Sequence, residues 1–173
     1  MHYLINIHCR VIIGRSYILS KNINSIEYIG INKDIHSSLN TFKHITIFEE
    51  IAVPNDKNIA QILKVTSQCK ISEKKLVKTP RGTSFDGSTL SGVAMIVNLI
   101  LTNKVDYMYF DTKQNFTTYG FSIPFSTNII IPDIYTSISN NIINCFIDNM
   151  NCKKTDEYKF LFSADIILSY ETY

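Results

Sequence analysis

The stretch that decides the fold lies between Lys78 and Pro132. Its segments, in order, are KTPRGTSFDG (78–87), VAMIVNLIL (93–101), FSIPFS (121–126) and IIIP (129–132). The turn-forming residues that interrupt them are Pro80, Gly82, Gly87 and Gly92. Apolar runs rich in β-branched and aromatic residues and separated by such residues are typical of consecutive β-strands. The stretch therefore predicts a β-rich domain. It carries no recognisable catalytic motif and so indicates little about chemistry.

Two strands inside this stretch can be assigned a place in the sheet. Met95–Leu101 is apolar on both faces apart from Asn98, which is typical of a central strand. We expect a hairpin at Asn103-Lys104 that leads into a second strand over 105–110. Gly120–Ser126 places Phe121, Ile123 and Phe125 on one face, and its Pro124 has no N–H to donate. This strand is therefore expected at a sheet edge or a bulge.

Alternating apolar and polar residues predict strands outside the stretch as well. Phe42–Val53 alternates in this way and ends at Pro54. Tyr158–Tyr170 is the clearest case, because one parity is apolar or aromatic throughout and the other is mostly polar. This pattern predicts a long, half-buried terminal strand. Asp133–Asp148 stays ambiguous between helix and strand.

A short helix is expected after Pro54. Asn55 or Asp56 can cap it, and Ile59, Ile62 and Leu63 then share one helical face. Separate strands over 64–72 and 75–78 follow. The predicted fold class is all-β, a mainly antiparallel β-sandwich or jelly-roll-like fold, with one or two short helices.

Length and composition limit the classes of function. The chain has 173 residues, of which 45% are apolar and 18% charged, and its formal net charge is +2. Such a charge is too small for the phosphate neutralisation on which nucleic-acid binding depends, so no nucleic-acid partner is expected. The densest basic cluster, interpreted as a solvated face, is Lys70, Lys74, Lys75, Lys78 and Arg81. Neither a secretory signal nor a membrane-spanning run is evident, so we expect synthesis in a cytosol.

No catalytic or ligand-binding apparatus is evident. The four histidines all lie in the first quarter of the chain, and none has a partner at the spacing of metal ligands: His2, His8, His36 and His44. We therefore predict no catalytic residue, no metal site, no cofactor and no enzymatic activity.

The four cysteines have no metal-binding spacing either. Cys69 and Cys145 are flanked by apolar residues on one strand face, which favours buried free thiols. Cys9 and Cys152 fall in segments interpreted as a terminal arm and a loop. They are the better candidates for inter-subunit disulfides, although all four remain candidates.

Several segments resemble those of a known family. They include PNDKNIAQI (54–62), GSTLSG (87–92), FSIPFST (121–127) and, upstream, IEYIGI (26–31). The residues that carry the resemblance are Pro54, Ile59, Ile62, Lys78, Pro80, Gly82, Gly87, Gly92, Phe121, Pro124, Phe125 and Pro132. Through these framework residues the chain resembles the SPOCS domain, which is found in clostridial spore-coat and spore-surface proteins. The resemblance implies a role in the spore envelope and implies no enzyme.

Together with the low charge and the 10 Tyr and 10 Phe, the resemblance predicts a structural protein of the spore surface layers (coat, exosporium or appendage), made in the mother-cell cytosol. We expect it to polymerise by β-strand addition, with inter-subunit disulfides as a further link. Residues 1–36 would be a strand-like arm and 37–173 the domain. The expected partners are other copies and other coat proteins. The alternative is a soluble adaptor or a module that binds glycan or peptidoglycan during coat assembly.

Overall fold

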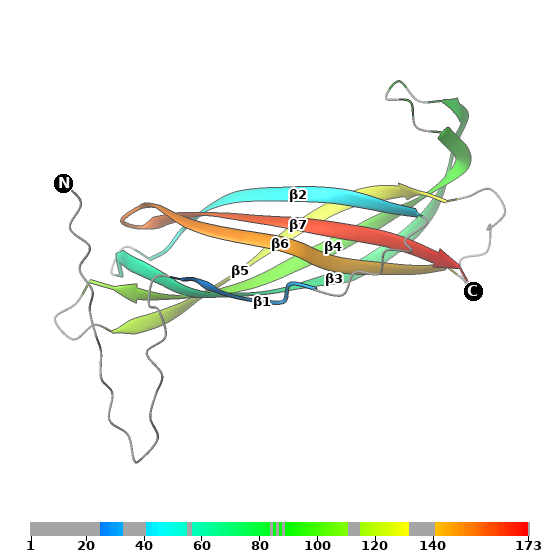
Figure 1. Ribbon diagram of the computed structural model, residues 1–173. Coiled ribbons are helices and arrows are strands. Elements are labelled where there is room, and N and C mark those ends of the chain that lie inside the picture. The colour runs from blue at the N-terminus through cyan, green and yellow to red at the C-terminus, as the bar shows by residue number, and fades with distance from the viewer. Residues whose placement is uncertain are drawn as a thin grey trace, which may run out of the picture.

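The computed structural model describes residues 25–32, 41–54, 57–83, 85, 87, 89–110, 115–131 and 141–172. Within these ranges the chain forms the strands β1 (Glu27–Ile29), β2 (Thr41–Ala52), β3 (Ile59–Thr83), β4 (Thr89–Tyr109), β5 (Phe116–Ile130), β6 (Asn141–Asp156) and β7 (Lys159–Thr172). One sheet has the order β1-β3-β4-β5 and the other β2-β7-β6. Figure 1 shows the two sheets as two layers packed face to face.

The all-β prediction is confirmed, and of its two forms the sandwich is the one observed. β3, β4 and β5 form an antiparallel meander, and β6 and β7 form a hairpin in the other sheet. All pairings are antiparallel except that of β1 with β3, which is parallel. The expected short helices are wrong, because the described part of the chain contains strands and no helix.

The region expected to be helical is the start of β3. Ile59, Ile62 and Val65 are all buried, and this spacing of three resembles a helical face. Register shifts between Ile59 and Gln61, and again between Ile62 and Lys64, explain it. Each β-bulge adds a residue to the strand, so the buried positions recur every third residue instead of every second. The expected cap at residues 55–56 lies outside the described residues.

β3 and β4 are also longer than predicted. The separate strands over 64–72 and 75–78 are one continuous strand, and β4 runs unbroken through the hairpin expected at Asn103-Lys104. Asn103 stays in the strand because its buried side chain has partners: Ser67 Oγ donates to its Oδ1 at 2.6 Å, and its Nδ2 donates to the Leu101 carbonyl at 3.2 Å. A polar residue satisfied in this way does not break a strand.

We expect Asn103→Ala to lower the free energy of unfolding by about 1–3 kcal/mol, because the buried Ser67 hydroxyl would lose its partner. Urea unfolding measures the change. Thr102→Ala, at an exposed position next along β4, is the matched control and should stay within about 0.5 kcal/mol of the wild type. Equal losses in the two variants would contradict the role given to Asn103.

The other strand predictions are confirmed. Met95–Leu101 lies in β4, between β3 and β5. Phe42–Val53 matches β2, and the apolar parity of Tyr158–Tyr170 is buried along β7. The strand that holds Pro124 is β5, at the edge of its sheet. The ambiguous segment is a strand from residue 141, whereas residues 132–140, with Pro132, lie outside the described residues.

The core between the sheets consists of two adjoining clusters. The larger contains Val65, Leu101 and Tyr107 from one sheet against Phe160, Phe162 and Ile166 from the other. The smaller contains Met95, Val97, Leu99, Ile129 and Ile131 against Ile143, Leu168 and Tyr170. Burying this apolar surface is the main stabilising contribution to the sandwich.

Residues 25–32 belong to this sandwich. β1 pairs with Lys64–Thr66 of β3 in its own chain, so the folded body begins before residue 37. Gly30, directly after β1, has φ of +109°, and a Cβ there would lie 2.0 Å from the carbonyl oxygen of Ser67. Only glycine allows the chain to pass this close to β3. Residues 1–24 lie outside the described residues, and the arm they were expected to form stays a prediction.

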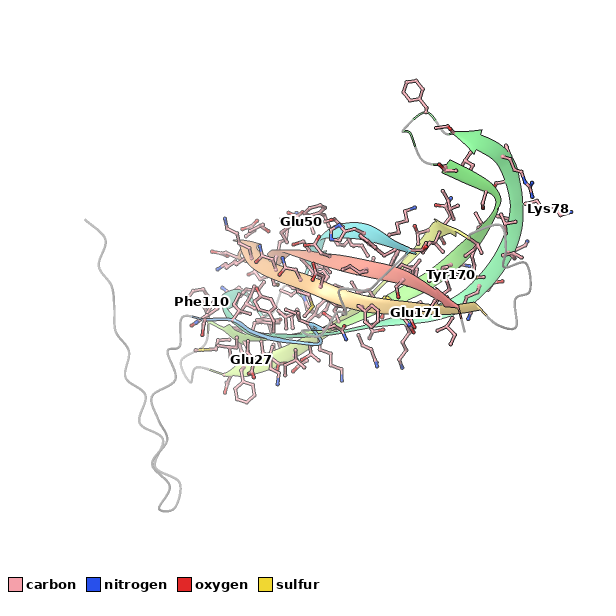
Figure 2. The ribbon with its side chains drawn as sticks, turned by 45° about the vertical axis from the view of Figure 1, so that its right-hand side comes forward. Glu27, Glu50, Lys78, Phe110, Tyr170 and Glu171 are labelled. Atoms are coloured by element: carbon pink, nitrogen blue, oxygen red, sulfur yellow. The ribbon has the colours of Figure 1, made fainter. Side chains whose placement is uncertain are left out.

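One hairpin projects from the sandwich. β5 accompanies β4 only from Ala94 onward, so the β3–β4 pairs from Lys78–Val93 to Thr83–Thr89 stand without a third strand. Figure 1 shows the two strands turning away from both sheets, and Figure 2 places Lys78 on this projection. Of the turn-forming residues expected to separate strands, Gly87 lies at the tip with φ of +85°, whereas Pro80, Gly82 and Gly92 lie within β3 and β4.

Candidate functional site: open sheet edges and a cysteine pair

The first feature that can contact another molecule is the open side of the sandwich. β2 ends one sheet and β5 ends the other, with 12 and 15 residues respectively. Among the described residues, β2 has no strand neighbour except β7, and β5 none except β4. Unpaired backbone groups along such an edge can bind a further strand.

The direction of these backbone groups follows from the register. The Val53 N–H donates to the Tyr158 carbonyl at 2.8 Å, and the β2–β7 pairing runs from Thr41 to Ala52 without a shift. Residues in an antiparallel pair alternate between facing the partner and facing away. The odd-numbered residues of β2 therefore bond to β7, and the even-numbered residues present their N–H and C=O groups to the open edge.

The β5 edge is less suited to accept a strand. Ile131 N–H donates to the Val93 carbonyl of β4, so in β5 the even-numbered residues face outward. Pro124 is one of them and has no N–H to offer. At Asn128, the carbonyl oxygen and Oδ1 accept from Lys43 Nζ at 3.0 and 2.8 Å, which ties β5 to β2. A proline at an outward-facing position is one of the devices that protect edge strands from pairing, whereas the inward-pointing charge, Lys43, belongs to β2.

Exposed aromatic side chains accompany both edges. Phe42 and Phe48 on β2 are 58% and 65% exposed, and Phe116 on β5 is 76% exposed. Each belongs to an outward face, whereas the inward residues Ile45 and Ile47 pack on the core. Large exposed apolar residues beside an unpaired edge are candidates for contact with another molecule.

On the opposite side of the sandwich, residues around β1 bond to two positions of the other edge strand, β6. Asn32 N–H donates to the Ile147 carbonyl at 2.8 Å, and Asn32 Oδ1 accepts from the Ile147 N–H at 3.0 Å. The Cys152 N–H donates to the Tyr28 hydroxyl at 3.1 Å. Burial raises the pKa of Tyr28. Backbone groups of β6 that would otherwise face outward are thus bonded within the chain.

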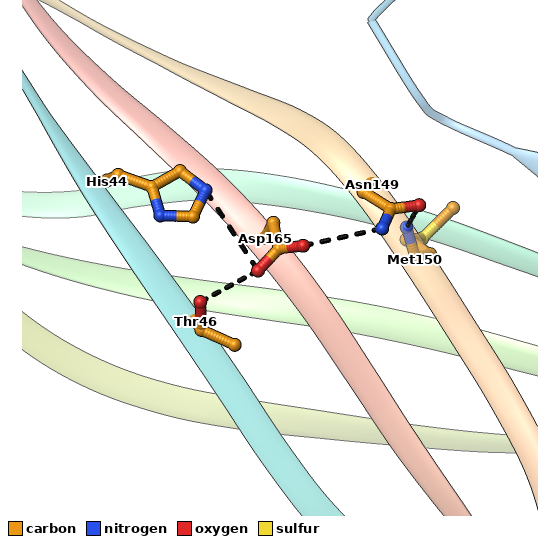
Figure 3. A network of polar contacts seen from close by, with 5 residues as sticks. All are labelled: His44, Thr46, Asn149, Met150 and Asp165. Carbon is orange, nitrogen blue, oxygen red and sulfur yellow. Dashed lines mark hydrogen bonds and ion pairs between the residues drawn. The ribbon is translucent and has the colours of Figure 1, made fainter.

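A polar network crosses the outer face of the β2-β7-β6 sheet. Asp165 accepts from Thr46 Oγ1 at 2.7 Å and from Asn149 Nδ2 at 3.4 Å, and His44 Nε2 lies 4.0 Å from it (Figure 3). Because Thr46 donates to the carboxylate and not to the imidazole, these three groups do not form the relay of a hydroxyl nucleophile. The network joins the three strands. The only sequence feature that indicates this network is the alternation of polar residues along β2 and β7.

A pair of cysteines lies between the two sheets. Cys145 Sγ of β6 lies 2.6 Å from Cys69 Sγ of β3 and donates a hydrogen bond to it. This bond lowers the pKa of Cys69 and raises that of Cys145. Both thiols line a partly open pocket of about 460 Å³, with Gly30, Asn32, Thr66, Ser67, Gln68 and Ile147. The two thiols are half-buried and free, close to the predicted buried state.

The loop position predicted for Cys152 is wrong. Cys152 lies in β6, its side chain is in the larger core cluster, and burial raises its pKa to about 12. The turn between β6 and β7 lies later in the chain, at Glu157-Tyr158. Cys9 lies outside the described residues, and an inter-subunit disulfide stays a prediction.

We expect Cys152 to resist alkylation by iodoacetamide at pH 8 in the folded protein. A thiol with a pKa of about 12 has about a thousandfold less thiolate at that pH than one at the usual value near 9. Mass spectrometry of digests after timed labelling gives the rate at each cysteine. Unfolding in urea should make Cys152 react at a normal rate, and equally fast labelling before unfolding would contradict its burial.

The framework residues fall into two groups. Ile59 and Ile62 are buried, and Phe121 and Phe125 pack against the core, where Phe121 meets Phe162 edge to face at a centroid distance of 5.5 Å. Pro54 follows β2. Most of the others lie in the projecting hairpin, namely Lys78, Pro80, Gly82, Gly87 and Gly92. The framework thus specifies the sandwich and its projection.

The described residues contain no group of three or more His, Cys, Asp or Glu side chains that could hold a metal ion. Among the same residues no helix is long and apolar enough to cross a membrane. Of the histidines, only His44 lies in the described part of the chain.

These features define a two-sheet β-sandwich with a projecting hairpin, one open side and a dithiol pocket. A family model described as the SipL, SPOCS domain matches residues 58–155, from β3 to the end of β6. This is more than half of the chain, and the chain belongs to the SPOCS domain family. Membership supports a role related to sporulation. Searches of curated proteins and of solved structures found no significant match.

Proposed function

We propose that this protein is a non-enzymatic structural component of the bacterial spore envelope that self-associates by β-strand addition. It would be made in the mother-cell cytosol and reside in a spore surface layer such as the coat, the exosporium or an appendage. Family membership supports the sporulation setting. The observation that carries self-association is the unpaired edge of β2.

The occupant that we propose for this edge is the segment Tyr3–Ile13 of a second copy. This segment is apolar and rich in β-branched residues, as an added strand requires. β2 is the favoured acceptor because its even-numbered residues include no proline, whereas β5 has Pro124. A net charge of +2 over 173 residues adds little repulsion between copies.

Phe48→Pro tests the proposal at one N–H group. Residue 48 faces the open edge, so proline there removes no hydrogen bond to β7 but takes one donor from the incoming strand. We expect the wild-type protein to form large assemblies in light scattering and electron microscopy, and Phe48→Pro to remain mainly monomeric.

Phe48→Thr is the matched control, because it removes the same phenyl group and keeps the N–H. It should assemble, although more weakly if the aromatic contact contributes. Circular dichroism and a melting curve establish that both variants are folded. Wild-type assemblies unchanged by Phe48→Pro would overturn strand addition at β2. A wild-type monomer that binds a glycan or a coat protein would instead support the adaptor alternative.

A further inference from the structure

The cysteine pair brings the two sheets of the sandwich into contact. Cys69 belongs to the β1-β3-β4-β5 sheet and Cys145 to the β2-β7-β6 sheet, 76 positions apart in sequence. Both side chains pack against both hydrophobic clusters, so the pair lies where the clusters meet. The sulfur separation of 2.6 Å approaches the about 2.05 Å of a disulfide bond.

We propose that Cys69 and Cys145 form an intramolecular disulfide that joins the two sheets when the protein meets an oxidising environment. This is a modification site of the single chain and does not depend on self-association. Inter-subunit links, if they form, would then have to use Cys9, because Cys152 is buried in the core.

The pocket provides access for an oxidant. Its lining includes both sulfurs, and it opens to solvent, so one end of a small disulfide such as oxidised glutathione can reach them. Cys69 is the first nucleophile, since the hydrogen bond from Cys145 stabilises its thiolate.

The exchange proceeds in two balanced steps. The Cys69 thiolate attacks one sulfur of the oxidant, forming a mixed disulfide and releasing one small thiolate. Cys145 gives its proton to that thiolate and attacks the Cys69 sulfur, and the second small thiolate leaves and takes up the proton that Cys69 had lost. The protein loses two protons and two electrons in total, and the oxidant gains them as two small thiols.

The link would reinforce the side of the sandwich where residues around β1 contact β6. There, the contacts of Asn32 with Ile147 and of Tyr28 with Cys152 hold β6 against the β1 region by hydrogen bonds, and Ile26, Tyr28 and Ile31 pack on the larger core cluster. A disulfide across so long a segment restricts the unfolded chain, and in a protein of this size it should raise Tm by on the order of 10 °C. The open β2 edge would be unaffected.

The test compares the full chain after treatment with oxidised glutathione and after reduction. Digestion without reductant should yield a peptide that contains both Cys69 and Cys145, and the intact mass should fall by two hydrogens. On a non-reducing gel this product should run as a monomer. Oxidation should raise Tm.

Cys69→Ser should abolish the linked peptide and the Tm difference between oxidised and reduced protein, whereas Cys152→Ala should retain both. If Cys69→Ser does not fold, peptide mapping of the wild type decides alone. The proposal is overturned if Cys69 and Cys145 remain alkylatable after oxidation, if the mapped link joins other cysteines, or if Cys69 links two chains in a dimer.

Discussion

Phe162→Ala is expected to lower the free energy of unfolding by about 3–5 kcal/mol. Phe162 of β7 is fully buried, and its ring meets Phe121 of β5 edge to face, so truncation leaves a cavity between the sheets. Since the total stability of a domain is about 5–15 kcal/mol, this variant would lose a large fraction of its stability.

Urea unfolding followed by circular dichroism measures the loss. Phe48→Ala removes the same group from an exposed position on the outer face and should change stability by no more than about 0.5 kcal/mol. Comparable losses in the two variants would contradict the assignment of inner and outer faces, and with it the sandwich.

Gly30→Ala is expected to detach β1 or to destabilise the protein by about 3 kcal/mol. Two costs combine here: a positive φ that disfavours any side chain, and a Cβ that would lie 2.0 Å from the Ser67 carbonyl oxygen. A backbone atom cannot move aside as a flexible side chain can. Displacement of β1 would also break the two hydrogen bonds between Asn32 and Ile147.

Gly87→Ala separates the two costs. Gly87 also has a positive φ, +85°, but no atom lies within 4 Å of a Cβ there, so only the conformational cost of about 1–2 kcal/mol remains. Urea unfolding compares the variants, and hydrogen exchange at the Ile147 amide reports on β1. Equal losses, with Ile147 still protected in Gly30→Ala, would contradict the close packing of Gly30 on β3.

The sequence predicts strands well where alternation is regular. The alternating residues of β7 predicted which of its faces is buried, and Pro124 predicted the edge position of β5. Both predictions succeeded because they depend on local backbone geometry. β3 failed for the opposite reason. Bulges after Ile59 and Ile62 changed its period, and no local signal marks a bulge that tertiary packing stabilises.

The candidate site was less predictable than the fold. Cys69 and Cys145 each point toward the interior, as their flanking residues predicted, but their contact depends on how the two sheets are superposed. The buried position of Asn103 depends likewise on Ser67, a residue on a neighbouring strand. Edges are a property of strand order, so the open side of β2 becomes visible only when the topology is known.

The central claim is that a second copy of the chain completes the sheet at β2. Hydrogen exchange resolved to single amides, on the dispersed monomer and on the assembled protein, tests it most directly. We predict that the odd-numbered β2 amides are protected in both states, and that those of Phe42, His44, Thr46, Phe48 and Glu50 become protected only on assembly. Even-numbered amides that still exchange rapidly in the assembly, or that are already protected in the monomer, would contradict the claim.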